Sequence, residues 1–184
     1  MNKMVAITVS GKIGSGKSTL AKKLAACLNL EYFSVGRQFR VLAEKEGLPI
    51  EEFIKKSPED LHIKIDNKMK EVAKTRNVVI DARLAGWMVP DADLKIFLTA
   101  PLKTRAHRIM KNRHKRIAEE KKDSETWVDE SVRREKIEWE KYNKLYGIDL
   151  NDLNGYDLVL NTERIGAEDL LEIVELVIKK AVKL

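Results

Sequence analysis

Residues 11–18 of this sequence read Gly-Lys-Ile-Gly-Ser-Gly-Lys-Ser. They fit the pattern G-x-x-x-x-G-K-[ST] of a phosphate-binding loop, whose glycines let backbone N–H groups wrap around phosphate oxygens. The loop directly follows an apolar run of strand length, Val5–Ser10, and directly precedes a helical pattern, Lys17–Leu28. An ordinary glycine-rich turn is the alternative interpretation. The context favours a phosphate-binding strand–loop–helix unit, because this motif requires a buried strand before it and a helix after it.

The chemistry of the loop predicts an ATP site with Mg²⁺ as cofactor. The ATP-binding residues that we expect are Gly11, Lys12, Ile13, Gly14, Ser15, Gly16, Lys17, Ser18 and Thr19. Lys17 would contact the β- and γ-phosphates as a catalytic residue, and the Ser18 hydroxyl would bind Mg²⁺. Asp81 ends a hydrophobic strand pattern and would orient Mg²⁺ through water or hold Ser18. The alternative for Asp81 is a simple cap at the end of a strand.

Strand and helix patterns alternate along the rest of the chain. This alternation predicts an α/β three-layer sandwich around a central parallel five-stranded sheet, the P-loop NTPase fold. The expected strands are Val5–Ser10, Glu31–Ser34, Asn77–Asp81, Leu94–Thr99 and Tyr156–Thr162. The expected helices are Lys17–Leu28, Arg37–Glu46, Pro58–Lys74, Leu102–Arg113, Val128–Tyr146 and Ala167–Lys183. Ligands of such sheets bind at the carboxyl ends of the strands.

Two regions interrupt the alternation. A short helical insert, about residues 34–75, contains extra helix between the second and third strands. A charged segment, Asn112–Thr126, has almost no apolar residues and cannot pack into a core. We expect a mobile lid there, at about residues 112–128.

Composition limits the class of protein. The 184 residues are expected to form one domain, 1–184, and no apolar run approaches the length of a membrane span. The N-terminus lacks a secretory pattern, so we expect a cytoplasmic protein. We also expect a monomer. The single cysteine, Cys27, excludes an internal disulfide, and its helical spacing places it in the core. The net charge of +6 suits nucleic acid, but equally suits two phosphorylated nucleotides as substrates.

Three further segments narrow the choice of activity. They are Ser-Val-Gly-Arg-Gln-Phe-Arg at 34–40, Asp-Ala-Arg-Leu-Ala-Gly-Trp at 81–87, and Tyr-Gly-Ile-Asp at 146–149. With the phosphate-binding loop, they resemble the nucleoside monophosphate kinases, and within these the archaeal type of cytidylate kinase. The resemblance covers essentially the whole chain. It implies transfer of the γ-phosphate of ATP to CMP, and to dCMP.

The resemblance also implies roles for individual residues. The residues that it assigns to binding of the acceptor nucleotide are Ser34, Arg40, Arg83, Glu138 and Lys141. The arginines would hold the acceptor phosphate, and Glu138 would accept from the cytosine amino group. Lys141 stands where cytidylate kinases commonly have an arginine, so it replaces a bidentate group by a point charge. Alternatively, Arg40 is a solvated helix residue, Arg83 forms a surface ion pair, and Glu138 belongs to an ion-paired solvent face.

Two neighbouring arginines compete for the lid role. The resemblance makes Arg134 the catalytic residue that stabilises the transferring phosphoryl group, and Arg133 is its close competitor. Other activities also stay open. A small kinase could act on UMP, AMP or a shikimate-like acceptor, and an ATP-switched RNA-binding factor would suit the basic lid. A GTPase is a poor fit, because Asn67-Lys68 lacks the aspartate of N-K-x-D.

Overall fold

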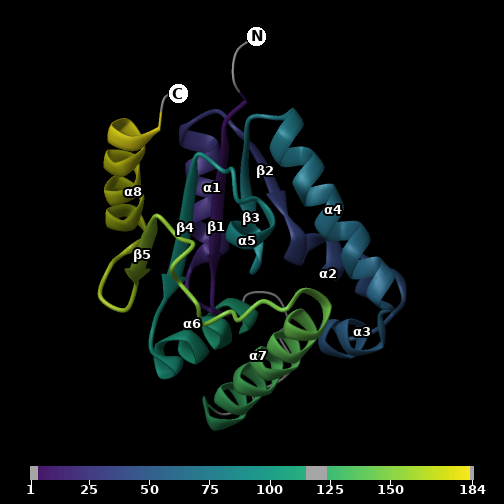
Figure 1. Cartoon of the computed structure of the whole chain (residues 1–184). Helices are drawn as coiled ribbons and strands as arrows, with labels where there is room; N and C mark the ends of the chain where they lie inside the picture. The colour runs from purple at the N-terminus through teal and green to yellow at the C-terminus, as the bar shows by residue number, and fades with distance from the viewer. Residues whose placement is uncertain (1–3, 115–123, 183–184) are drawn as a thin grey trace.

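The computed structural model of the chain describes residues 4–114 and 124–182. Its centre is a five-stranded sheet with the strand order β2-β3-β1-β4-β5, visible in Figure 1. Every neighbouring pair of strands is parallel. The strands are β1 (Ala6–Gly11), β2 (Glu31–Ser34), β3 (Val78–Asp81), β4 (Leu94–Thr99) and β5 (Leu158–Asn161). The predicted α/β fold with a central parallel sheet is confirmed.

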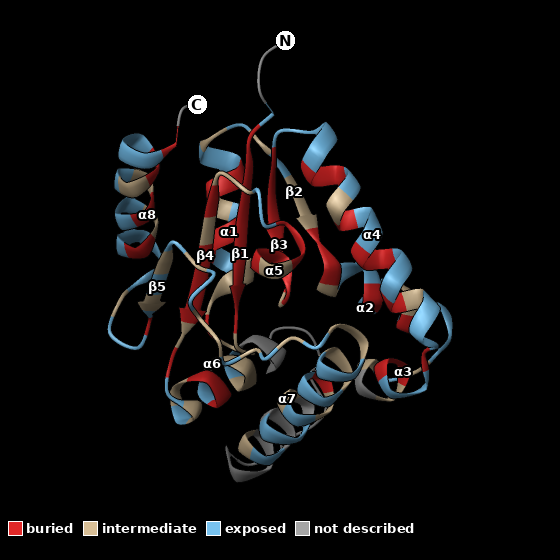
Figure 2. Cartoon of the chain, viewed as in Figure 1, coloured by how far each residue is buried: buried red, intermediate tan, exposed pale blue. Residues whose placement is uncertain are grey.

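Helices cover both faces of the sheet. They are α1 (Lys17–Cys27), α2 (Val35–Lys45), α3 (Ile50–Lys56), α4 (Glu59–Thr75), α5 (Ala85–Met88), α6 (Leu102–His114), α7 (Ser124–Tyr146) and α8 (Ala167–Ala181). Helices α1 and α8 pack on one face, where Ile7 and Val9 of β1 are fully buried. Helices α2 to α5 pack on the other face, around Val78 and Ile80 of β3. Figure 2 shows the resulting buried centre.

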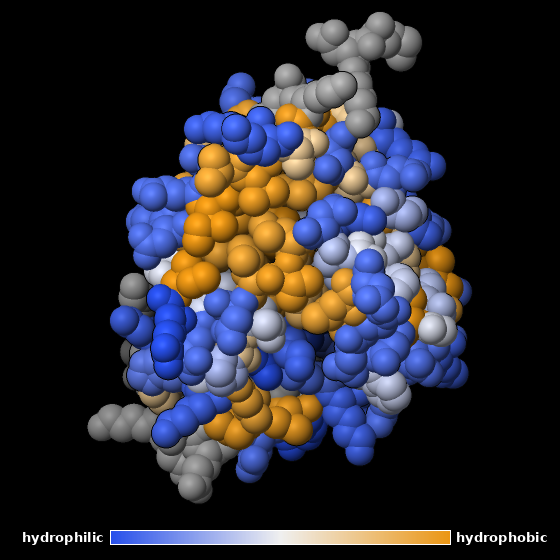
Figure 3. All heavy atoms as spheres, turned by 60° about the vertical axis from the view of Figure 1, so that its left-hand side comes forward, coloured by the Kyte–Doolittle hydropathy of each residue, from blue (hydrophilic) through white to orange (hydrophobic). Residues whose placement is uncertain are grey.

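The central strands carry mainly apolar side chains on both faces of the sheet, because helices cover both faces. All six residues of β1 and all four of β3 are buried. The edge strand β5 instead alternates between half-buried and exposed residues. Val159 on β5 and Ile173 and Leu176 on α8 are exposed, and Figure 3 shows a broad apolar area on this side of the molecule.

Some local features differ from the sequence expectation. Helix α2 begins at Val35 rather than Arg37, because the Ser34 hydroxyl caps it by accepting from the Arg37 N–H at 3.3 Å. Helices α3 and α5 were not foreseen as separate elements, since each spans only two turns or fewer. Cys27 is exposed and not in the core, because it lies at the end of α1, beside Glu175 of α8.

Helices α6 and α7 lie across the carboxyl ends of the strands, next to the loop that follows β1 (Figure 1). The expected insert, residues 34–75, corresponds to α2, α3 and α4. Of the expected lid, residues 115–123 lie outside the described residues, and the remainder ends α6 and begins α7. Within the described ranges, no helix combines the length and the apolar character that a membrane span needs.

Candidate active site

The phosphate-binding loop joins β1 to α1 and depends on glycine at two positions. Gly16 has φ +98° and caps the N-terminus of α1, a left-handed conformation that side chains disfavour. Gly14 has φ +74°, and a Cβ there would lie 2.5 Å from the backbone oxygen of Arg105. The loop thus packs directly against α6 and directs the N-terminus of α1 at the space above the sheet. Such an N-terminus favours anions.

Asp81, at the end of β3, accepts hydrogen bonds from three hydroxyl groups. Its Oδ2 accepts from Ser18 at 2.6 Å, from Tyr32 at 2.8 Å and from Ser34 at 3.2 Å. The register of the parallel strands explains the arrangement, since Ser34 of β2 lies opposite Asp81. Burial, and then the Asp81 carboxylate, raise the pKa of the Tyr32 hydroxyl to about 12, so this hydroxyl stays a donor at neutral pH.

The Ser18–Asp81 pair fits a Mg²⁺ ion that is bound mainly by phosphate oxygens. Ser18 donates its proton to Asp81, so the oxygen lone pairs of Ser18 stay available for a metal. Both residues offer the hard oxygen ligands that Mg²⁺ prefers. Among the described residues, no group of three or more His, Cys, Asp or Glu could hold a metal without a substrate. This pattern is typical of an ion that arrives with a nucleotide.

A cavity of about 190 Å³ connects the phosphate-binding loop with the helical insert. Its lining combines two kinds of residue. Groups suited to phosphate and metal are Lys17, Ser18, Arg40, Asp81 and Arg83, and Glu138 lines the cavity as well. A largely apolar surface is formed by Phe39, Ile50, Ile54, His62 and Tyr142, the first four of which belong to the helical insert. The cavity could therefore hold a molecule that is anionic at one end and flat and weakly polar at the other.

Two of the predicted cationic side chains that line this cavity are Lys17 and Arg40. Lys17 donates from Nζ to the backbone oxygen of Lys12 at 2.9 Å, within its own loop. Arg40 lies on α2, and its guanidinium turns back toward Gly36 near the start of the same helix. The structure thus brings Arg40 and Arg83 to one cavity, although they lie on different elements.

Arg83 and Glu138 form a buried ion pair that the sequence did not predict. The Arg83 Nε contacts the Glu138 Oε2, and the two side chains are 15% and 5% exposed. Glu138 lies on α7, so the pair joins that helix to the segment after β3. Tyr142 lies one turn further along α7, and burial, followed by the Glu138 charge, raises its pKa.

Lys141 contacts the backbone at the end of α3. Its Nζ donates to the backbone oxygens of Ile54 at 2.9 Å and of Ser57 at 3.2 Å. These carbonyls end a helix and attract a cation. Lys141 therefore connects α7 to the insert, and it is absent from the lining of the cavity. Burial lowers its pKa from the usual lysine value.

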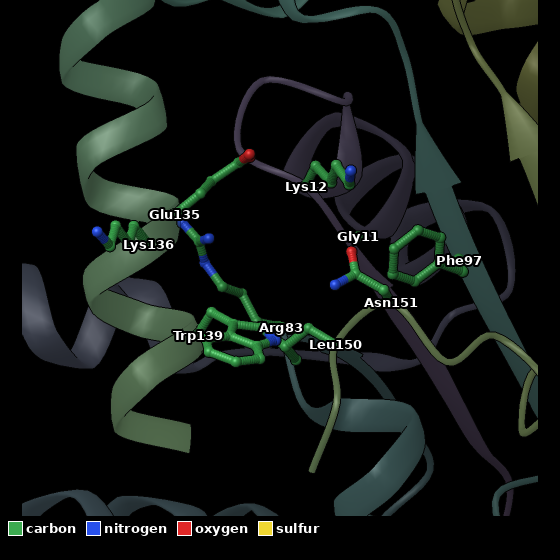
Figure 4. Close-up of a pocket in the computed structure, with 9 residues that line it drawn as sticks. All are labelled: Gly11, Lys12, Arg83, Phe97, Glu135, Lys136, Trp139, Leu150 and Asn151. Atoms are coloured by element: carbon green, nitrogen blue, oxygen red, sulfur yellow. The ribbon is translucent and has the colours of Figure 1, made fainter. Parts of the chain in front are cut away.

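Glu135 connects α7 to the phosphate-binding loop. Its carboxylate accepts from the Ile13 N–H at 3.1 Å and forms an ion pair with Arg105 of α6. Arg105 also donates to the backbone oxygen of Ile13 at 3.0 Å and to that of Ala100 at 2.9 Å. The loop is thus held between two helices through Ile13. Figure 4 shows Glu135 extending from α7 toward the loop.

A second cavity, of about 250 Å³, lies beside Glu135 and is drawn in Figure 4. It is lined by Gly11, Lys12, Arg83, Phe97, Glu135, Lys136, Trp139, Leu150 and Asn151. Although this cavity is larger, it lacks Lys17, Ser18 and Asp81. Phosphate chemistry therefore belongs to the smaller cavity, and Arg83 contributes to both.

The predicted lid arginines are only partly placed. Both belong to α7, and Arg133 is exposed. The side chain of Arg134 lies outside the described residues.

Sequence reasoning missed four residues of this region: Ser57, His62, Arg105 and Glu135. Arg105 is 4% exposed and follows the apolar spacing of α6, so its place beside Ala106 on the buried face was a usable signal. His62 is 3% exposed and had no signal in the sequence, because the three histidines, His62, His107 and His114, do not cluster and show no metal-ligand spacing. Its hydroxyl partner Ser57 lies in the turn between α3 and α4, where no helical periodicity applies.

Comparison with known proteins places the chain among kinases. A family model described as "Cytidylate kinase-like family" matches residues 6–164. A cytidylate kinase of Ignicoccus hospitalis is 42% identical over 176 residues, covering 94% of this chain and 98% of that protein. A cytidylate kinase of Pyrococcus horikoshii is also 42% identical, over 92% of this chain and 85% of that protein. The solved shikimate kinase of Bacteroides thetaiotaomicron shares the fold, with a TM-score of 0.64, 20% identity and coverage of 96% and 99%.

Proposed function

Because the chain belongs to the cytidylate kinase-like family, we propose that it transfers the γ-phosphate of ATP to CMP and dCMP. The products are ADP and CDP or dCDP. One observation carries the proposal: a single cavity is lined by Lys17 and Ser18 of the phosphate-binding loop, by two arginines and by largely apolar residues of the insert. This lining matches a nucleoside monophosphate, with its phosphate toward ATP and its base in the insert.

Catalysis rests on positioning and on neutralisation of charge. Lys17 leaves the Lys12 carbonyl and contacts the β- and γ-phosphates, while backbone N–H groups of residues 11–19 hold ATP. Arg40 and Arg83 hold the acceptor phosphate close to the γ-phosphate despite their mutual repulsion. An oxygen of the acceptor phosphate attacks in line. This oxygen is already ionised at neutral pH, so the reaction needs no general base.

Ser18 and Asp81 would hold Mg²⁺, Ser18 directly and Asp81 through water. When bound, this ion would neutralise charge on the β- and γ-phosphates. Asp81 also fixes the orientation of the Ser18 hydroxyl by accepting its hydrogen bond. The Tyr32 and Ser34 hydroxyls in turn fix Asp81.

Residues of α7 complete the site. Glu138 orients Arg83 through the ion pair, and Lys141 holds the insert against α7. Arg134, or its neighbour Arg133, stabilises charge on the transferring phosphoryl group. The proposal also includes a cytoplasmic monomer without a nucleic-acid partner, and light scattering of the pure protein tests the monomer.

The test is ADP release from ATP·Mg²⁺ with CMP, dCMP, UMP, AMP, GMP and shikimate offered separately. We expect fast release with CMP and dCMP. Release with AMP, UMP or shikimate alone would keep the phosphoryl-transfer chemistry but replace the acceptor. No stimulation by any of the six compounds would contradict the proposal, and steep salt-dependent RNA binding would then favour an ATP-switched RNA-binding factor.

A further inference from the structure

His62 is a buried polar residue in the lining of the acceptor cavity. It projects from α4, is 3% exposed and lines the cavity together with Phe39, Ile50, Ile54 and Tyr142. Its ring packs against that of Phe39, with centroids 4.7 Å apart. One ring nitrogen, Nε2, lies 2.7 Å from the Ser57 hydroxyl oxygen. The other, Nδ1, is buried and has no hydrogen-bond partner among the described residues.

The hydrogen bonds of Ser57 assign the proton on the imidazole. The Ser57 hydroxyl has one proton, and it donates this proton to the Ile54 backbone oxygen at 3.0 Å. Its oxygen must then accept from Nε2–H of His62 for both hydrogen bonds to form. A neutral imidazole carries one proton, so Nδ1 presents a lone pair.

A positive imidazolium would be unfavourable at this place. The ring is buried, and the ammonium group of Lys141 lies nearby, bound to the Ile54 and Ser57 carbonyls. Burial and then Lys141 lower the pKa of His62 to about 4. At neutral pH, His62 is therefore an acceptor at Nδ1 and cannot become a second donor by simple protonation.

A buried acceptor without a protein partner is unfavourable, and a donor from a water or from the ligand relieves the cost. Cytosine and uracil differ at the 4-position, where cytosine carries an amino donor and uracil a carbonyl acceptor. We infer that His62 is the residue that selects cytosine over uracil, by accepting from the cytosine amino group at Nδ1, and that Ser57 positions it by fixing its tautomer. Uracil would set its carbonyl oxygen against the lone pair and leave both acceptors unpaired.

This inference rests on the proposed function and revises one part of the sequence expectation. Glu138 was expected to accept from the amino group, but its carboxylate is paired with Arg83. Both Glu138 and His62 line the acceptor cavity, but His62 has no ion pair among the described residues. In this assignment Glu138 acts on the acceptor phosphate through Arg83, and His62 contacts the base.

The test compares kcat/KM for CMP and UMP in wild type, His62→Leu, His62→Asn and Ser57→Ala. His62→Leu should lower kcat/KM for CMP by roughly tenfold or more, mainly through KM, without lowering that for UMP. His62→Asn can place its amide oxygen near the Nδ1 position and should keep most of the preference. Ser57→Ala leaves the imidazole in place but frees its tautomer, so the preference for CMP should fall severalfold.

The melting temperature of every variant reports whether it is folded, and its affinity for ATP reports whether the ATP site is intact. Should His62→Leu fail to fold, Ser57→Ala decides by itself. An unchanged CMP-to-UMP ratio in the folded variants, with wild type active on CMP, would overturn the role of His62 and leave the proposed function standing. Absence of CMP turnover in wild type would instead overturn the proposed function and this inference with it.

Discussion

The carboxylate of Glu135, on α7, accepts a 3.1 Å hydrogen bond from the backbone N–H of Ile13, inside the phosphate-binding loop. The same carboxylate is paired with Arg105, which donates to the Ile13 carbonyl. One residue of the loop, Ile13, is thus held at both its backbone donor and its backbone acceptor by side chains of α6 and α7. The position of α7 and the shape of the loop are therefore coupled.

Replacement of Glu135 tests this coupling. Glu135→Ala leaves the buried Arg105 guanidinium without its carboxylate, so we expect a loss of about 1–3 kcal/mol in the free energy of unfolding. Urea denaturation measures the loss. The matched control is Glu140→Ala on the same helix, where the exposed carboxylate lies 4.0 Å from Lys136, and a change below about 0.5 kcal/mol is expected. Equal effects of the two substitutions would argue against a structural role for Glu135.

Replacement of Lys17 tests the phosphate contact. Lys17→Ala should leave a folded protein, since the Lys17 hydrogen bond to the Lys12 carbonyl is part-buried and lies within the loop, but should lower turnover by several orders of magnitude. Lys74→Ala, at an exposed position of α4, is the control and should retain full activity. Near-normal turnover of Lys17→Ala in a coupled assay of ADP release would contradict the assigned role.

Variants of Asp81 and Tyr32 distinguish a residue that supports Mg²⁺ binding from a residue that only positions Asp81. Asp81→Ala should lower kcat at least roughly a hundredfold and raise the Mg²⁺ concentration needed for half-maximal rate, because Ser18 loses its acceptor. Tyr32→Phe removes one of the three donors to Asp81 but keeps Ser18 in place, so its rate should stay within about tenfold of wild type. A titration of rate against Mg²⁺ for the two variants distinguishes them, and identical curves would rule out the separation.

Several parts of the site were predictable because their signals are local in sequence. The loop at 11–18 has fixed spacing, and Asp81 ends an apolar strand, so both could be placed at one edge of the sheet. The partner of Glu138 could not be predicted, because Arg83 is far away in the sequence and meets it only through the packing of α7 on the strand ends. Lys141 looked like a ligand of the acceptor, yet it lies close to the end of a helix, α3, that the sequence did not resolve. Pairings of charged groups across elements depend on tertiary packing that periodicity does not report.

The pH dependence of stability tests the environment of His62. Burial and the neighbouring Lys141 lower its pKa from 6.5 to about 4, while Glu59 has a smaller opposing effect. Between these values the unfolded chain binds a proton that the folded protein does not. Stability should therefore fall as the pH decreases from 6.5 to 4, by up to roughly 3 kcal/mol.

The contribution of His62 is obtained by difference. The free energy of unfolding of wild type minus that of His62→Leu, measured at intervals between pH 4 and pH 8, should decrease as the pH falls. The contributions of the carboxylates cancel in this difference. Parallel curves would mean that His62 titrates with an ordinary pKa and is not held neutral by its surroundings.

The most direct test of the account follows the phosphoryl group itself. The protein is incubated with CMP, Mg²⁺ and ATP labelled with ³²P at the γ-position, and the products are separated and counted. We predict that the label appears in the β-phosphate of CDP, in an amount equal to the ADP formed, and that Lys17→Ala abolishes it. Label found in inorganic phosphate, with none in CDP, would contradict the assignment of this cavity to a nucleoside monophosphate kinase.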